Sequence, residues 1–231
     1  RIAALSDRLS ALRIPKLILD WQRRLTQLLS QVDHVVAVCD WVRDVLLRNG
    51  VPPHKLTLSR QGITLGGAFH PEPAPRPSAS LRIAYFGRTG REKGADILVS
   101  ALASLPAVDV TLDCYAIRQA GFDAGFEALT ALACHDARVT IRSAVRPGDV
   151  HDEMRAYDLI AVPSRCLETG PLVVLDAQAA RVPVLGTAIG GIAELVRDGV
   201  DGILIPSTEP EEWARTIAAI AVDRPRLERL R

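Results

Sequence analysis

The sequence predicts an α/β fold built around a doubly wound parallel sheet. From residue 81 onwards, short apolar runs rich in β-branched residues alternate strictly with longer segments that have helical spacing, which is typical of βαβ units. Several of the apolar runs end in glycine-rich or acidic turns, where open α/β sheets bind their ligands. The 231 residues are 48% hydrophobic and 24% charged, an ordinary globular balance.

The beginning of the chain has the pattern of a helix. Residues 1–32 carry Leu and Ile at helical spacing, and Pro15 is expected to break this helix in two. Five basic side chains could form a face for a membrane surface: Arg8, Arg13, Lys16, Arg23 and Arg24. The alternative is a solvated face, because Asp7 and Asp20 dilute the charge. With no bilayer-length apolar run and no signal-peptide pattern, a cytoplasmic location is expected, peripheral membrane contact remaining open.

A strand–helix–strand unit is expected next. The strands are expected at residues 33–39 and 54–60, and the helix at residues 41–49. Asp40 is suited to be the N-cap of this helix, and Gly50 to end it.

Residues 66–80 have the composition of a linker, dense in Pro, Gly and Ser. We therefore expect a domain boundary there, with residues 1–65 before it and a domain of residues 81–231 after it. Because the sequence begins with Arg1 and its only methionine is Met154, we expect it to be a fragment of a longer protein.

The second domain is expected to hold a sheet of about six strands. The expected strands are residues 82–87, 109–116, 138–144, 159–163, 184–187 and 202–206. The expected helices are residues 95–105, 122–134, 147–157, 171–180, 192–197 and 209–221. Right-handed crossovers between parallel strands would place these helices on both faces of the sheet.

Charge and composition exclude several classes of partner. The net charge of +1 gives no electrostatic footprint for nucleic acid. The four cysteines form no C-x-x-C pair, so reduced, buried thiols are expected rather than disulfides or a metal site. The five histidines have no metal-binding spacing, so neither a metal nor a cofactor is expected.

A glycine-rich turn with three cations follows the first strand of this domain. It reads G-R-T-G-R-E-K-G from Gly87 and carries Arg88, Arg91 and Lys93. Its glycines allow close approach and its cations supply charge and donors, which suits a diphosphate. The alternative is a solvated turn in which Glu92 balances the charge.

Two further turns are expected at the same edge of the sheet. Residues 163–176, P-S-R-C-L-E-T-G-P-L-V-V-L-D, place Glu168 between a buried strand and a helix that Gly170 and Pro171 open. Amides at a helix start can hold a phosphate, and a carboxylate beside them can accept bonds from sugar hydroxyls. The alternative is that Glu168 only caps the helix. With the glycine turn A-I-G-G-I-A-E from Ala188, these turns could line a cleft of nucleotide-sugar size.

Three segments carry a family resemblance. They are F-G-R-T-G-R-E-K-G-A-D-I-L from Phe86, Y-D-L-I-A-V-P-S from Tyr157, and E-T-G-P-L-V-V-L-D-A-Q-A-A-R-V-P-V-L-G-T-A-I-G-G-I-A-E-L-V-R-D-G-V-D-G-I-L-I-P from Glu168. They resemble the Rossmann-like nucleotide-sugar-binding domain of the group-1 type GT-B glycosyltransferases, a retaining family. Weaker similarity in V-V-A-V-C-D and R-Q-G-I-T extends the resemblance over about residues 33–221.

The resemblance implies roles for individual residues. Arg88 and Lys93 match the basic pair on the donor diphosphate, and Glu168 matches the first Glu of an E-x7-E motif, which contacts the donor sugar; these are the implied catalytic residues. The second Glu, which binds ribose, is here Asp176, one methylene shorter. The implied donor-binding residues are Gly87, Gly170, Pro171, Leu172, Asp176 and Val145. Cys114-Tyr115-Ala116-Ile117 stands where the family has a glycine turn, and Ala144 at a usual Gly position, so the base is not indicated.

The implied function is retaining, metal-independent transfer of a sugar from a nucleotide-diphosphate sugar to an unidentified acceptor hydroxyl, in polysaccharide or glycoconjugate biosynthesis. Residues 1–65 would be the end of the acceptor-side domain, 66–80 the linker and 81–231 the donor domain, and the fragment alone is expected to be inactive. The alternatives are a non-catalytic nucleotide-sugar-binding module and a nucleotide-sugar epimerase of the same architecture. The sequence indicates no oligomeric state.

Overall fold

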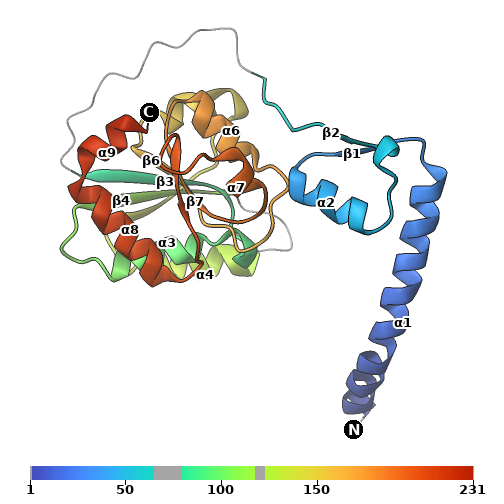
Figure 1. The fold of residues 1–231 in the computed structure, drawn as a ribbon. Coiled ribbons are helices and arrows are strands. Elements are labelled where there is room, and N and C mark those ends of the chain that lie inside the picture. The colour runs from blue at the N-terminus through green and yellow to red at the C-terminus, as the bar shows by residue number, and fades with distance from the viewer. Residues whose placement is uncertain (1, 65–79, 118–122, 231) are drawn as a thin grey trace. The chain divides into compact units, whose positions relative to one another are not determined.

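The computed structural model describes residues 2–64, 80–117 and 123–230, with side-chain surroundings from residue 14 onwards. The chain divides into two units, Arg1–Ser59 and Arg60–Arg231 (Figure 1). The expected linker lies outside the described residues, apart from its last residue, Ser80.

The first unit holds one long helix and a small two-stranded parallel sheet. Its elements are α1 (Ile2–Gln31), β1 (Val35–Ala37), α2 (Asp40–Arg48), the 3₁₀ turn η1 (Pro53–Lys55) and β2 (Leu56–Leu58). The prediction that Pro15 breaks the first helix is wrong, because α1 continues through it. A proline removes one backbone hydrogen bond, and the rest of this 30-residue helix supplies the others. The second expected strand starts later than predicted because η1 takes its first residues, and Cys39 rather than Asp40 is the N-cap of α2.

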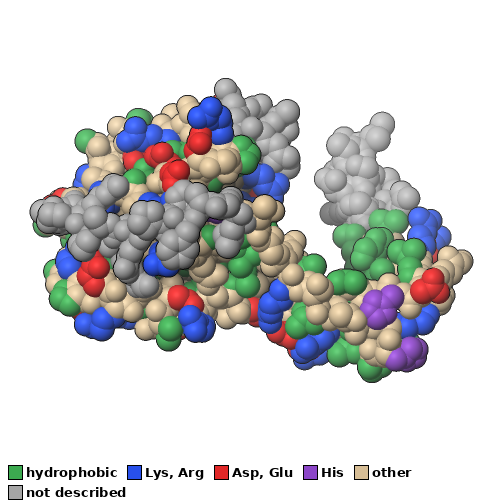
Figure 2. All heavy atoms as spheres, turned by 90° about the horizontal axis from the view of Figure 1, so that it is seen from above, with side chains coloured by type: hydrophobic (Ala, Val, Ile, Leu, Met, Phe, Trp, Pro, Cys, Tyr) green, Lys and Arg blue, Asp and Glu red, His purple; other side chains and the backbone are tan. Residues whose placement is uncertain are grey.

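Large apolar side chains are exposed along α1 (Figure 2). Five of them recur at the spacing of one helix face, Ile14, Leu17, Ile18, Trp21 and Leu28, while Leu19 lies off it. Within the part of the chain that the structure describes, no helix combines the length and the apolar character needed to cross a bilayer. Contact of α1 with a membrane surface stays a prediction.

The second unit is built on a six-stranded sheet in which every neighbouring pair is parallel (Figure 1). The strands are β3 (Leu81–Arg88), β4 (Val110–Ile117), β5 (Val139–Arg142), β6 (Leu159–Val162), β7 (Val184–Thr187) and β8 (Gly202–Ile205). Their order, β5-β4-β3-β6-β7-β8, confirms the predicted doubly wound sheet. The chain winds outwards from β3 in one direction and from β6 in the other, so the crossover point lies between these two strands.

Helices cover both faces of this sheet (Figure 1). They are α3 (Ala95–Ala103), α4 (Asp123–Ala133), α5 (Val150–Met154), α6 (Leu172–Ala179), α7 (Gly190–Leu195), α8 (Pro210–Val222) and α9 (Arg224–Arg229). The segment expected as one helix over residues 147–157 is a 3₁₀ turn, η3 (Pro147–Asp149), followed by the short α5. Helix α9 was not among the expected helices; its Pro225 lies in the first turn, where a proline is tolerated.

Alternate residues of β3 point into two separate cores, one on each face of the sheet. Leu81, Ile83 and Tyr85 join the core that contains Trp213 of α8, which is fully buried. Ala84 joins the core formed with α5, α6 and α7. The strands β6, β7 and β8 are nearly continuous buried runs, whereas β4 and β5 carry exposed residues between their apolar ones. Both patterns are typical of strands, which is why their positions could be predicted from the sequence.

A buried carboxylate ties the start of β3 to β6 and to α9. Asp158, directly before β6, accepts a hydrogen bond from the backbone N–H of Arg82 at 2.9 Å. Its Oδ1 is 3.3 Å from the Arg82 guanidinium and its Oδ2 is 3.4 Å from that of Arg224. The side chain of Asp158 is only 4% exposed, so it depends on these donors.

We expect Asp158→Asn to lower the free energy of unfolding by about 2 kcal/mol, the range of hydrogen bonds to a charged group. Urea unfolding followed by circular dichroism measures it. The matched control is Asp152→Asn, since Asp152 is 64% exposed and forms a local ion pair with Arg155, three residues along the chain. We expect the control to change stability by less than about 0.5 kcal/mol. Equal effects of the two substitutions would contradict a structural role for Asp158.

Candidate functional site

Three turns meet at the carboxyl edge of the sheet. They follow β3, β6 and β7, which are neighbours in the strand order. Because all the strands are parallel, the turns that follow them lie at the same edge. The first two of these turns flank the crossover point, where open α/β sheets bind ligands.

The β3 and β6 turns are joined by an ion pair. Lys93 Nζ lies 2.5 Å from Oε1 of Glu168, and the hydroxyl of Ser164 donates to the same oxygen at 2.8 Å. The side chains of Lys93 and Glu168 are 21% and 14% exposed, so the pair is largely shielded from water. The N-cap of α6 is Pro171, while the carboxylate of Glu168 reaches across to the β3 turn. Both features favour a site over the solvated-turn and capping alternatives.

A glycine and an arginine hold the same two turns together. Gly94 has φ +74°, and a Cβ on it would lie 2.0 Å from the carbonyl oxygen of Pro163. Arg165 donates its backbone N–H to the Glu92 carbonyl at 2.8 Å. Its guanidinium donates to both carboxylate oxygens of Asp96, at 2.7 and 2.8 Å. Sequence reasoning missed Arg165 because its partners are far away in the chain.

The third turn packs against the backbone of Glu168. The N–H of Gly191 donates to the Glu168 carbonyl at 2.6 Å. A Cβ on Gly191 would lie 2.7 Å from that carbonyl oxygen, and Gly190 has φ +52°. A side chain at either position would push the turns apart. Glu168 is therefore fixed by its side chain on one side and by its backbone on the other.

The start of α6 adjoins this carboxylate. Gly170 has φ +150°, Pro171 is the N-cap, and Leu172 is the first helical residue, with 50% of its surface exposed. The first N–H groups of a helix have no partner within the helix, and they carry its positive dipole end. This arrangement suits a phosphate or a sugar hydroxyl next to Glu168.

Arg88 lies at the exposed end of β3, and a side chain of the same strand bonds to its backbone. The hydroxyl of Tyr85 donates to the Arg88 carbonyl. Burial raises the pKa of Tyr85, helped by the nearby Cys114, so the phenol stays a donor. A Cβ on Gly87 would lie 2.8 Å from that hydroxyl, so glycine at position 87 leaves room for the Tyr85 side chain. Tyr85 was missed because its position in the strand is that of an ordinary core residue.

Asp176 contacts a residue that the sequence did not single out. Its Oδ1 lies 2.8 Å from Nε2 of His151, which belongs to α5. The two side chains are 26% and 20% exposed. Asp176 lies in the second turn of α6, whereas Glu168 lies in the loop that precedes this helix, so helical spacing does not relate the two carboxylates.

Aromatic side chains fill the region expected to be a base pocket. Tyr115 stacks on Phe86 with ring centroids 4.3 Å apart, and its hydroxyl lies 2.7 Å from that of Tyr157. Burial, together with its hydrogen bond to Glu153, raises the pKa of Tyr115 to about 12. Val145 is partly buried against the same core. β4 runs through Tyr115 to Ile117, so a strand end stands where the family has a glycine turn.

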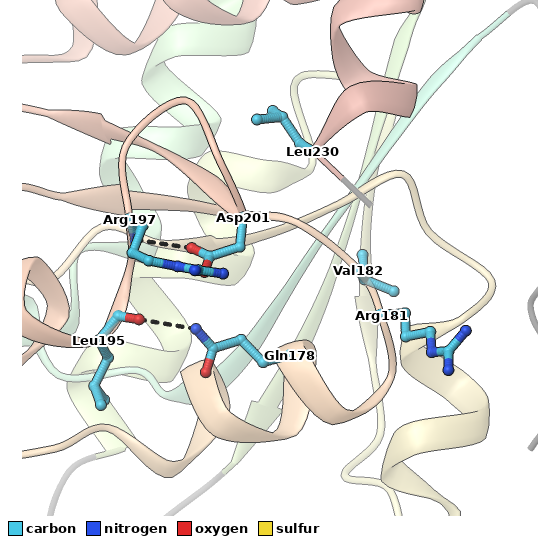
Figure 3. A pocket seen from close by; sticks show the side chains of 7 residues that line it. All are labelled: Gln178, Arg181, Val182, Leu195, Arg197, Asp201 and Leu230. Carbon is cyan, nitrogen blue, oxygen red and sulfur yellow. Dashed lines mark hydrogen bonds and ion pairs between the residues drawn. The ribbon is translucent and has the colours of Figure 1, made fainter. Parts of the chain in front are cut away.

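Two cavities lie away from this edge. One, of about 390 Å³, is lined by residues that precede β7 and β8 and by Leu230, at the amino ends of these strands (Figure 3). Its polar groups bond to one another: Gln178 donates to the Leu195 carbonyl at 2.8 Å, and Arg197 to Asp201 at 2.7 Å. The second cavity, of about 420 Å³, lies beside α3 and α4. Neither contains the predicted site residues.

The four cysteines, all among the described residues, form no disulfide, and they differ in burial. Cys39 and Cys114 are buried as predicted, and burial raises the pKa of Cys114 to about 12. Cys134 is exposed, so the prediction of burial is wrong there; it follows the last residue of α4, outside the packed helix face. Among the described residues, no three His, Cys, Asp or Glu side chains are grouped to hold a metal, and metal independence stays a prediction.

Known proteins share this architecture. The chain is 31% identical over 207 residues to the D-inositol 3-phosphate glycosyltransferase of Mycobacterium tuberculosis, covering 83% of this chain and 41% of that protein. Anabaena HepE, solved with UDP-glucose, superposes with a TM-score of 0.75 at 22% identity, covering 90% of this chain and 60% of that one. Sucrose-phosphate synthase from Thermosynechococcus elongatus gives a TM-score of 0.75 at 25% identity, covering 90% and 54%.

The family assignment rests on the second unit. A model of the family described as glycosyl transferases group 1 matches residues 80–223, the whole of the sheet with its crossovers and α8. The chain spans less than half the length of the curated relatives it matches, 41% of each. With a match over most of its residues and the strand order described above, this chain belongs to the group 1 glycosyltransferases.

Proposed function

We propose that this chain forms the donor side of a retaining glycosyltransferase, which moves a sugar from a nucleotide-diphosphate sugar to an acceptor hydroxyl. The observation that carries the proposal is the Lys93–Glu168 pair at the crossover point, held where three turns meet. The cation of such a fixed pair can stabilise the negative charge of a departing diphosphate. The carboxylate beside it can stabilise the positive charge of an electron-poor sugar.

The diphosphate would lie along the β3 turn and the start of α6. Arg88 and Lys93 supply positive charge, and the amides after Pro171 supply donors. Lys93 is paired with Glu168. Binding a diphosphate would draw the ammonium towards the phosphate, leaving the carboxylate to accept from sugar hydroxyls.

The two carboxylates would divide the donor between them. Glu168, at the turn, would contact the sugar, and Asp176, further along α6, would contact the ribose. Only the first is close to the bond that breaks. Contacts that strengthen as charge develops at the anomeric carbon lower the barrier, whereas uniform contacts only tighten binding.

The chemistry we propose is a front-face displacement with retention. The acceptor hydroxyl loses its proton to the departing phosphate as the sugar passes through an oxocarbenium-like state. The protein stabilises the negative charge that builds on the diphosphate, through Arg88, Lys93 and the amides of α6. Since these groups supply positive charge and donors, we propose that no metal is required.

The acceptor would be held mainly outside the sheet unit. We propose that residues 1–65 belong to the acceptor side, residues 66–80 to the linker and residues 81–231 to the donor domain. We expect residues 1–231 alone to bind a donor nucleotide and to transfer nothing. A nucleotide-sugar epimerase would instead invert a stereocentre of the donor sugar. A binding module would neither transfer nor epimerise the sugar, even within a longer protein.

The first functional prediction concerns the cations of the β3 turn. We expect Arg88→Ala and Lys93→Ala each to weaken binding of a nucleoside diphosphate by about 1.5–3 kcal/mol, the range for hydrogen bonds to charged groups. Calorimetry with UDP, GDP and ADP measures the loss. Arg91→Ala removes an equal charge from the same turn, at an exposed residue of the 3₁₀ turn η2 (Arg91–Lys93), and serves as the matched control. Equal losses in all three variants would indicate general attraction rather than contact.

The second functional prediction separates the carboxylates by kinetics of the active transferase. We expect Glu168→Gln to lower kcat more than it raises KM, because its contact strengthens in the transition state. We expect Asp176→Asn mainly to raise KM for the donor, and Asp176→Glu to be tolerated. A loss of kcat in Asp176→Asn together with a pure KM effect in Glu168→Gln would reverse the two assignments.

A further inference from the structure

The bond between His151 and Asp176 connects two helices on the same face of the sheet. His151 lies in α5, and Asp176 lies in the second turn of α6, with 2.8 Å between Nε2 and Oδ1. An ionised carboxylate only accepts hydrogen bonds, so Nε2 carries the proton and donates. With the side chains 20% and 26% exposed, the pair is partly buried and keeps surface that a ligand can contact.

This bond restricts the carboxylate without using it up. A carboxylate has two oxygens and about four acceptor positions, so one donor leaves room for ligand hydroxyls. A donor from a neighbouring helix selects one orientation of the side chain before any ligand arrives. Preorganisation of this kind reduces the entropy lost on binding.

The need for such a partner follows from the residue type. Asp176 is one methylene shorter than a glutamate, so its carboxylate sits closer to the helix and covers a smaller range of positions. A hydroxyl that a glutamate could reach by changing rotamer must be met by an aspartate from one orientation. His151 supplies a fixed donor that selects this orientation.

We propose that His151 is a positioning residue that aims the carboxylate of Asp176 at the ribose hydroxyls of the donor nucleotide. This inference rests on the proposed function, which places a nucleotide at this edge of the sheet. It goes further by naming the residue that orients the ribose contact. The competing explanation is a clamp that only holds α5 to α6.

Ribonucleotides and their 2′,3′-dideoxy counterparts distinguish positioning from clamping. The probes are UDP, GDP and ADP with the matching dideoxynucleotides, measured by calorimetry on the 231-residue chain. The variants are His151→Leu, which removes the donor, and His151→Gln, which keeps an N–H donor. The control is His135→Leu. His135 is exposed and follows α4, which connects β4 to the edge strand β5, whereas Asp176 lies in α6, which connects β6 to β7 on the other side of β3.

We expect His151→Leu to weaken binding of the preferred ribonucleotide about tenfold, the lower end of the range for a hydrogen bond to a charged group. Binding of its dideoxy counterpart should change less than about twofold, because the contact at issue is missing from that ligand. His151→Gln should keep most of the parent chain's affinity for the ribonucleotide. In a chain that already carries Asp176→Asn, adding His151→Leu should not change this affinity further. His135→Leu should change neither affinity.

Three results would overturn the inference, each in a different way. Equal losses for ribo- and dideoxynucleotides in His151→Leu would assign His151 to the clamp. A parent chain that binds both kinds of nucleotide equally would remove the ribose contact and leave the proposed function standing. A parent chain that binds none of the nucleotides would overturn the proposed function together with this inference. His151→Gln keeps the test open if His151→Leu does not fold, because loss of its ribonucleotide preference would equally contradict positioning.

Discussion

The site depends on the packing of three turns around Glu168. Its carboxylate accepts from Lys93 and Ser164, and its carbonyl accepts from Gly191, so the β3, β6 and β7 turns share one residue. Close backbone approach makes this possible, since a Cβ at Gly94 or Gly191 would overlap a carbonyl oxygen of the neighbouring turn. Glycine at these positions therefore allows the close packing that fixes the Glu168 carboxylate, rather than making a loop flexible.

The sheet explains why these turns come together. β3 and β6 are adjacent although α3, β4, α4, β5 and α5 lie between them in the chain. The two cores fix both faces, and Asp158 anchors the opposite end of the β3–β6 pair. The packed sheet thus supports the turns, and the charged groups lie at the carboxyl edge of this sheet. Electrostatic stabilisation of a departing diphosphate requires such a fixed arrangement, because groups that must reorganise first lose much of their effect.

Much of the second unit could be predicted because its strands are short apolar runs, nearly continuous in β6, β7 and β8, that alternate with helical segments. A proline was a less reliable signal, since Pro15 lies within α1. Individual site residues could be named from their turns and from family resemblance. Their contacts could not, because Lys93 and Glu168 are separated by 75 residues and only the strand order brings them together. Arg165 and His151 act through such long-range contacts, whereas Tyr85 bonds to Arg88 only three residues along the chain. No local pattern distinguishes these residues from core or surface residues.

The central claim is that a nucleotide binds at the edge where these three turns meet. Amide chemical-shift mapping by NMR, with UDP, GDP and ADP titrated into the isotope-labelled chain, tests it most directly. We expect the largest shifts in residues 87–94, 163–172 and 188–191, together with Asp176. Shifts confined to the cavity lined by Gln178 and Leu195, at the opposite edge of the sheet, would contradict the claim, as would the absence of any shift with all three nucleotides.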